Sequence, residues 1–70
     1  MSDTKTLGDE LPKEMARVRA LLPLYREIGP GGFFALSMMN NDLDRAARAM
    51  ADGDIVEMIR VYQSLKEYSA

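Results

Sequence analysis

The stretch Phe33–Met50, FFALSMMNNDLDRAARAM, decides the fold expected for this 70-residue chain. Its core candidates are spaced three or four residues apart, at Leu36, Met39, Leu43, Ala46 and Met50. This spacing forms one apolar stripe on a helix, with Asn40, Asp44 and Arg48 away from it. The polar triplet 40–42 favours a helix cap, but the stripe crosses it without a slip. We therefore predict one continuous helix over residues 32–51.

The preceding segment ELPKEMARVRALLPLYREI, residues 10–28, predicts a first amphipathic helix. Its apolar face comprises Leu11, Met15, Val18, Leu21, Leu22, Tyr25 and Ile28. Asp9 is expected to cap the N-terminus of this helix. Pro23 removes one backbone donor within it, yet the apolar spacing continues on both sides of the proline. A kinked helix is therefore favoured over two separate helices.

Glycines mark both expected corners of the chain. Gly29 can adopt the positive φ that ends a helix, and the run GPGG at residues 29–32 predicts a short turn between antiparallel neighbours. Gly53 is expected to end the second helix. Asp54 and Glu57 are spaced as a reciprocal capping pair that opens a third helix over residues 55–68.

The third helix carries two apolar ridges. One comprises Ile55, Ile59 and Tyr62, and the other comprises Met58, Val61, Leu65 and Tyr68. Two ridges allow packing against two neighbouring helices. The fold class expected is all-α, a small antiparallel three-helix bundle with a kinked first helix. Residues 9–70 form its single domain, and residues 1–8, which show no periodicity, form a flexible N-terminal leader.

The chain contains no histidine and no cysteine, which excludes Ser–His–Asp triads, Cys–His pairs and the common zinc sites. Asp52, Asp54 and Glu57 cluster at one turn and offer oxygen ligands for a hard cation, but helix capping accounts for them. We therefore expect a protein that is not an enzyme, with no cofactor, no metal and no small-molecule substrate.

Nine basic and eleven acidic residues give a net charge of −2, with the two signs interspersed. Nucleic-acid binding, which needs a concentrated positive field, is not favoured. The alternative function is a small DNA-binding transcriptional regulator that uses Arg45 and Arg48, against which stand Asp42 and Asp44 on the same helix. No apolar run is long enough to span a membrane and no signal peptide is visible, so a cytoplasmic location is expected.

Phe34 and Met38 lie opposite the main stripe of the second helix, where they are either exposed or covered by the kinked first helix. Leu24 presents a similar case. A core this small seldom supplies more than about 3–5 kcal/mol, which favours a homodimer or binding to another protein. We expect a non-enzymatic protein–protein interaction module. Its candidate interaction surface comprises Leu24, Phe34, Met38, Val61 and Tyr68.

The segments ELPKEMARVRALLPLY, residues 10–25, and GDIVEMIRVYQSLKEY, residues 53–68, resemble small uncharacterised all-helical proteins of bacterial genomes and prophages. The resemblance extends over residues 10–68 as a general pattern of Leu, Met, Arg and Tyr at helical spacing. It implies a bacterial or phage cytoplasm. It assigns no activity and no site residue to this chain.

Overall fold

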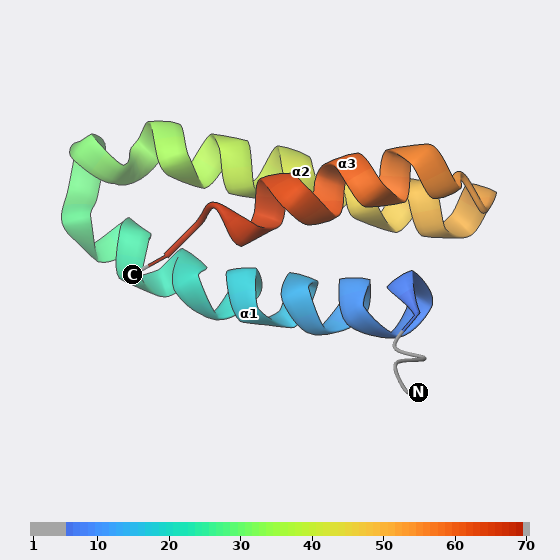
Figure 1. Cartoon of the computed structure of the whole chain (residues 1–70). Helices are drawn as coiled ribbons and strands as arrows, with labels where there is room; N and C mark the ends of the chain where they lie inside the picture. The colour runs from blue at the N-terminus through green and yellow to red at the C-terminus, as the bar shows by residue number, and fades with distance from the viewer. Residues whose placement is uncertain (1–5, 70) are drawn as a thin grey trace.

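The computed structural model describes residues 6–69, and every regular element among them is helical. The elements in order are α1 (Leu7–Ile28), the 3-10 turn η1 (Gly29–Gly32), α2 (Phe33–Asp52) and α3 (Ile55–Lys66). Helix α2 runs opposite to α1 and α3, and each α-helix packs against the other two (Figure 1). The predicted all-α class is therefore confirmed.

Helix α1 begins at Leu7, three residues before the predicted start at Glu10. Thr6 precedes the first turn and its carbonyl accepts the N–H groups of Asp9 and Glu10, so Asp9 is not the N-cap residue. The half-buried Leu7 packs against the core, which explains why the helix extends to it. Residues 7 and 8 thus do not belong to a leader, and residues 1–5 lie outside the described part of the chain.

The proline-containing helix is continuous, as predicted, because α1 passes through Pro23 without a break. It ends at Gly29, whose φ of 87° confirms the expected positive value. The GPGG segment differs from the expected turn, since it forms η1 and joins α1 directly to α2. The described residues therefore form two uninterrupted helical stretches, 7–52 and 55–66, instead of three separated helices.

Close backbone contact at Gly32 explains how the chain reverses direction without leaving helical structure. A Cβ atom built on Gly32 would lie only 2.3 Å from the backbone oxygen of Tyr25. Without a side chain at this position, the start of α2 approaches the last turns of α1 directly. The second corner follows the sequence-based prediction, with Gly53 in the left-handed conformation at a φ of 66°.

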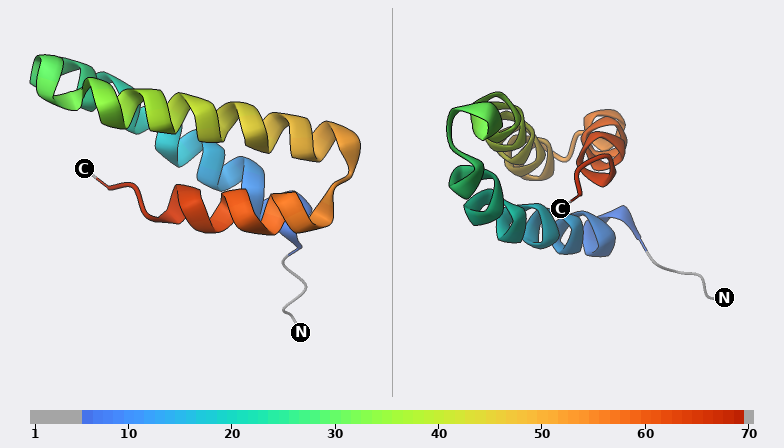
Figure 2. Two further views of the ribbon diagram at one scale, coloured as in Figure 1. Left: turned by 90° about the horizontal axis from the view of Figure 1, so that it is seen from above. Right: turned by 90° about the vertical axis from the view of Figure 1, so that its left-hand side faces the viewer.

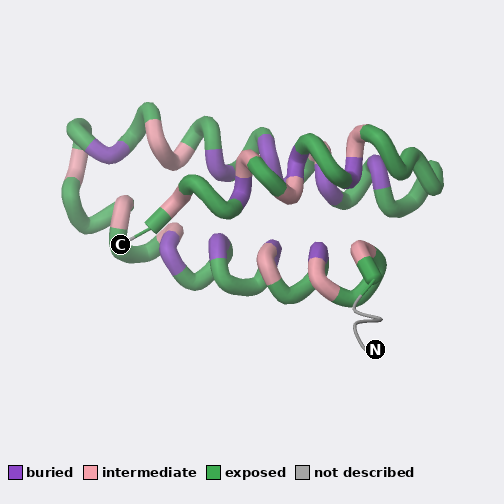
Figure 3. Tube along the Cα trace, viewed as in Figure 1, coloured by how far each residue is buried: buried purple, intermediate pink, exposed green. Residues whose placement is uncertain are grey.

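Each helix contributes one buried stripe to the core, and the buried segments of the trace recur along all three α-helices (Figure 3). The buried apolar side chains are Leu11, Met15, Val18, Leu21, Met39, Leu43, Ala46, Ala49, Met58, Val61 and Leu65. On α2 the stripe differs from the prediction, because Leu36 is half-buried and Met50 is exposed. The buried face is rotated toward Asp42 and Ala49, and the Asp42 carboxylate bonds to Tyr68 beyond the end of α3.

The two-ridge prediction for α3 is wrong in part. The ridge that contains Met58, Val61 and Leu65 is buried, whereas Ile55 and Ile59 of the other ridge are exposed. Viewed end-on, α2 lies beside α3 and α1 runs below both of them (Figure 2). One stripe therefore reaches both neighbours. Ile55 and Ile59 of the second ridge stay uncovered, whereas Tyr62 packs partly against the core. Within residues 6–69, no helix combines the length and the apolar character needed to cross a bilayer.

Candidate interaction surfaces

Large exposed apolar side chains gather at the two corners of the molecule, which lie at opposite ends (Figure 1). Among residues 6–69 there are nine such side chains. The α1–α2 corner surface comprises Leu24, Ile28, Phe33, Phe34 and Met38. The α2–α3 corner surface comprises Met50, Ile55, Val56 and Ile59. Exposed apolar side chains that gather at one place on a small protein are typical of contact sites, so both corners are candidates.

Helix α1 does not cover Phe34 and Met38 of the α1–α2 corner surface. Phe34 is 78% exposed and Met38 is 45% exposed. Leu24 and Ile28 lie one turn apart on α1 and are also exposed. Helix α1 packs against the buried face of α2 that contains Met39 and therefore leaves the opposite face of α2 uncovered.

Two residues assigned to the interaction surface from sequence lie elsewhere. Val61 is fully buried in the core, because the ridge of α3 that carries it faces both other helices. Tyr68 is partly buried, and its hydroxyl donates a hydrogen bond to Asp42 Oδ2 at 2.8 Å. Val61 is therefore a core residue, and Tyr68 belongs to a polar network between α2 and the C-terminal end of α3.

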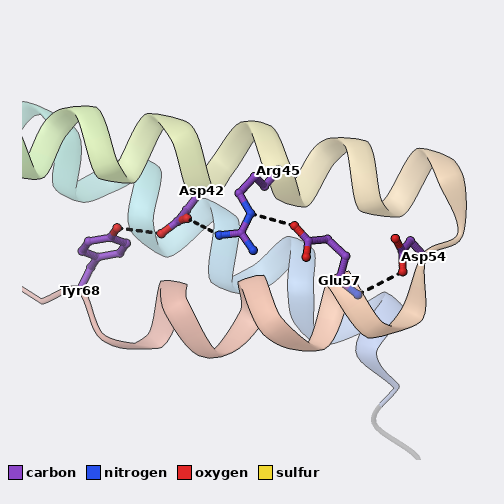
Figure 4. Close-up of polar contacts among 5 residues, drawn as sticks. All are labelled: Asp42, Arg45, Asp54, Glu57 and Tyr68. Atoms are coloured by element: carbon purple, nitrogen blue, oxygen red, sulfur yellow. Dashed lines mark hydrogen bonds and ion pairs between the residues drawn. The ribbon is translucent and has the colours of Figure 1, made fainter.

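This network joins four polar side chains along the α2–α3 interface (Figure 4). Asp42 Oδ1 accepts a hydrogen bond from Arg45 Nη1 at 3.1 Å, and Arg45 Nε donates to Glu57 Oε2 at 2.8 Å. Among residues 6–69, Asp42 is the one buried polar residue. Its two carboxylate oxygens both have donors, which offsets the cost of removing the charge from water.

The core-facing position of Asp42 was not predicted. It lies three residues after Met39 and four before Ala46, so its helical position is on their face. That spacing could have indicated that Asp42 faces the core. Asp42 was instead counted in the polar triplet 40–42, which favours a helix cap.

The predicted capping pair at the start of α3 is half confirmed. Asp54 Oδ1 accepts the Glu57 N–H at 3.2 Å, as expected for an N-cap. Glu57 does not return a bond to the Asp54 N–H, because that donor already bonds to the Ala49 carbonyl at 2.9 Å. The Glu57 side chain binds Arg45 instead, and this hydrogen bond lowers the pKa of Glu57 and raises that of Arg45.

The arginines of α2 have acidic partners. Arg45 contacts Asp42 and Glu57, and Arg48 forms an ion pair with Asp44 at 2.9 Å. Paired guanidinium groups give no concentrated positive face, so nothing in this geometry favours the DNA-binding alternative.

Arg17 of α1 bonds to the C-terminal end of α3. Its Nη2 donates to the Leu65 carbonyl at 2.9 Å, and its Nη1 donates to the Tyr68 carbonyl at 2.8 Å. The last carbonyls of a helix lack partners within the helix. Arg17 therefore binds the carbonyl of Leu65, which also accepts the Tyr68 N–H at 3.2 Å, and that of Tyr68 just beyond α3. These bonds tie the end of α3 to α1.

Two further features of the described residues bear on ligands. Residues 6–69 contain no group of three or more acidic, histidine or cysteine side chains placed to hold a metal ion. They also enclose no pocket. The acidic cluster at the second corner is divided, because Glu57 lies against Arg45 while Asp54 caps α3.

Comparison with models of protein families, with curated proteins and with solved structures finds no match. The resemblance to small bacterial and prophage proteins stays a prediction, and the function is argued below from the two corner surfaces.

The network makes a prediction about stability at high pH. Partial burial, followed by the hydrogen bond and charge of Asp42, raises the pKa of Tyr68 to about 12. In the unfolded chain the pKa of tyrosine is 10. Because the pKa of Tyr68 is higher in the folded protein, this residue contributes stability below pH 10, and the contribution is lost as the pH rises toward 12. Relative to Tyr68→Phe, the free energy of unfolding should fall by up to about 1.4 kcal/mol per pH unit over this window.

Urea unfolding of both proteins at several pH values between 9 and 12 measures this difference. Groups other than Tyr68 titrate in both proteins, so they cancel in the comparison. A constant difference across the window would contradict the assignment of the raised pKa to Tyr68.

Proposed function

We propose that this protein is a non-enzymatic interaction module of a bacterial or phage cytoplasm that associates with a second copy of itself. In this proposal α1, α2 and α3 act as one antiparallel three-helix unit. The α1–α2 corner surface is the contact between copies. The observation that carries the proposal is the exposure of five large apolar side chains at one end of the molecule, of which Phe34 is the most exposed.

The area of this surface suits a weak dimer. A fully buried aromatic side chain removes roughly 200 Å² from water, so five side chains that are about half exposed supply on the order of 500 Å² per copy. Two copies would then bury about 1,000 Å², at the lower end of the range for specific interfaces. We therefore expect a dissociation constant in the micromolar range or above.

The charges around this corner also permit contact between identical surfaces. Residues 28–41 contain no charged side chain, and the two charged residues before them, Arg26 and Glu27, are of opposite sign. In a two-fold dimer the same patch meets itself, so a patch with strong net charge would repel its copy. This patch carries no net charge and avoids that cost.

Phe34→Gln should weaken self-association by at least tenfold, because a central exposed aromatic is the residue type that contributes most to such contacts. Sedimentation velocity over about 1 μM to 1 mM measures the change, with a wild-type mass that rises from the monomer value of 7.8 kDa. Ile59→Gln is the matched control, since it replaces an exposed apolar helix residue at the opposite corner. It should leave the association unchanged.

Two results would count against the proposal. One is a wild-type chain that stays monomeric over the whole range. The other is an equal effect of Phe34→Gln and Ile59→Gln.

A further inference from the structure

The α2–α3 corner surface combines exposed apolar side chains with acidic ones. Ile55 is 57% exposed and Val56 is 58% exposed in the first turn of α3, and Ile59 follows one turn later. Met50 adds an exposed thioether from the last turn of α2. None of these side chains contributes to the core. This face of α3 has no partner within the described part of the chain.

Acidic residues without a basic partner border this surface. Asp52 and Asp54 are exposed at the turn between α2 and α3, and among residues 6–69 neither forms an ion pair. The two arginines in the second half of α2, Arg45 and Arg48, already contact other carboxylates. Arg60, which lies one turn beyond Val56, offsets only part of the negative charge.

We propose that the α2–α3 corner surface docks a basic amphipathic helix of another protein. Ile55 and Ile59 lie one turn apart and form a ridge that fits between the apolar side chains of such a helix. Lysine or arginine residues along the edge of the partner would lie against Asp52 and Asp54. Opposite charges at the rim raise the association rate and select against acidic partners.

A second copy of this chain suits the α2–α3 corner surface poorly. In a two-fold contact this net negative surface would meet an identical one, so Asp52 and Asp54 of the two copies would repel each other, with Arg60 offsetting only part of that charge. The charge-free α1–α2 corner surface has no such penalty. The two ends therefore differ in the partner they suit, although both are apolar.

This inference goes beyond self-association and does not depend on it. The two corners lie at opposite ends of the molecule, so contact at one leaves the other free (Figure 1). A dimer joined at the α1–α2 corner surface would present two acidic docking surfaces, which increases the avidity for a partner that carries two helices. A monomer would still bind a single helix.

The probe is a synthetic helical peptide of about 18 residues, with a leucine stripe flanked by lysines, titrated into the 70-residue chain. A second peptide has the same leucine stripe flanked by glutamates. We expect the lysine peptide to bind at least tenfold more tightly than the glutamate peptide. Backbone amide NMR shifts on binding should concentrate at residues 50–60.

Variants of the chain separate the apolar and the charged contributions. Ile59→Gln should weaken binding of the lysine peptide about tenfold, whereas Phe34→Gln should leave it unchanged, including where Phe34→Gln abolishes self-association. Asp52→Asn with Asp54→Asn should weaken binding several-fold and reduce its salt dependence. Asparagine caps a helix about as well as aspartate, so α3 should remain intact in this variant.

The matched charge control is Glu27→Gln with Glu67→Gln, which removes two negative charges away from the α2–α3 corner surface. It should bind the lysine peptide as the wild type does. Equal binding of the two peptides, an equal loss in the charge control, or no binding at all would overturn the proposal. Amide shifts at residues 50–60 that depend on protein concentration without peptide would also overturn it, in favour of a second copy at this surface.

Discussion

Gly32→Ala is expected to lower the free energy of unfolding by about 2–3 kcal/mol, because overpacking a close contact costs this much when the neighbour cannot move. The new Cβ would lie 2.3 Å from the Tyr25 oxygen and 3.2 Å from the Tyr25 carbonyl carbon. Both atoms are backbone atoms of α1, so relief requires α1 and α2 to separate at the corner. For a core that supplies about 3–5 kcal/mol, this loss would leave much of the chain unfolded.

Gly31→Ala is the matched control one residue earlier. Its Cβ would meet Ile28 Cγ2 at 3.7 Å, an ordinary van der Waals contact. This substitution should stabilise the protein by about 0.4–1 kcal/mol, because alanine restricts the unfolded chain more than glycine does. Urea unfolding followed by circular dichroism measures both variants. Equal stability of Gly32→Ala and Gly31→Ala would show that the close approach at Tyr25 is absent in solution.

Asp42→Ala is expected to cost about 2 kcal/mol, the loss typical when a buried charged acceptor is removed from its donors. The Tyr68 hydroxyl would lose its acceptor, and Arg45 would retain only Glu57. The control is Asp44→Ala, which breaks the exposed ion pair with Arg48 and should cost only about 0.3–0.5 kcal/mol. Thermal and urea unfolding of both variants provide the comparison.

A double-mutant cycle tests whether Asp42 acts through Tyr68. Tyr68→Phe removes the hydroxyl alone, so the losses caused by Asp42→Ala and Tyr68→Phe should not add in the double variant. A coupling of at least about 0.5 kcal/mol is expected for side chains in direct contact. Fully additive losses would show that the hydrogen bond between them contributes nothing to stability.

The helices were largely predictable because their apolar spacing is local information. The continuous passage through Pro23 and through the triplet 40–42 followed from stripes that kept their register on both sides. The ends were less predictable. Helix α1 extends to Leu7 because that side chain finds a core to pack against, and this contact lies far along the chain.

Exposure was predictable only for those candidate residues whose helix does not carry a second apolar ridge. Leu24, Phe34 and Met38 lie off the main stripes and are exposed. Val61 was assigned to the wrong environment because α3 carries two apolar ridges, and spacing within α3 cannot rank them. The ridge that contains Val61 is buried because it faces both α1 and α2.

The sequence by itself determined that this chain is helical, that Gly29 and Gly53 end helices, and that Asp54 caps α3, because each depends on residues within one or two turns. Only the tertiary structure decided that Asp42 is buried, that Arg17 caps α3, and which ridge of α3 stays exposed. These outcomes depend on where a distant helix lies. Helical periodicity specifies which side chains share a face, but the neighbour that covers a face is set by the packing of the whole chain.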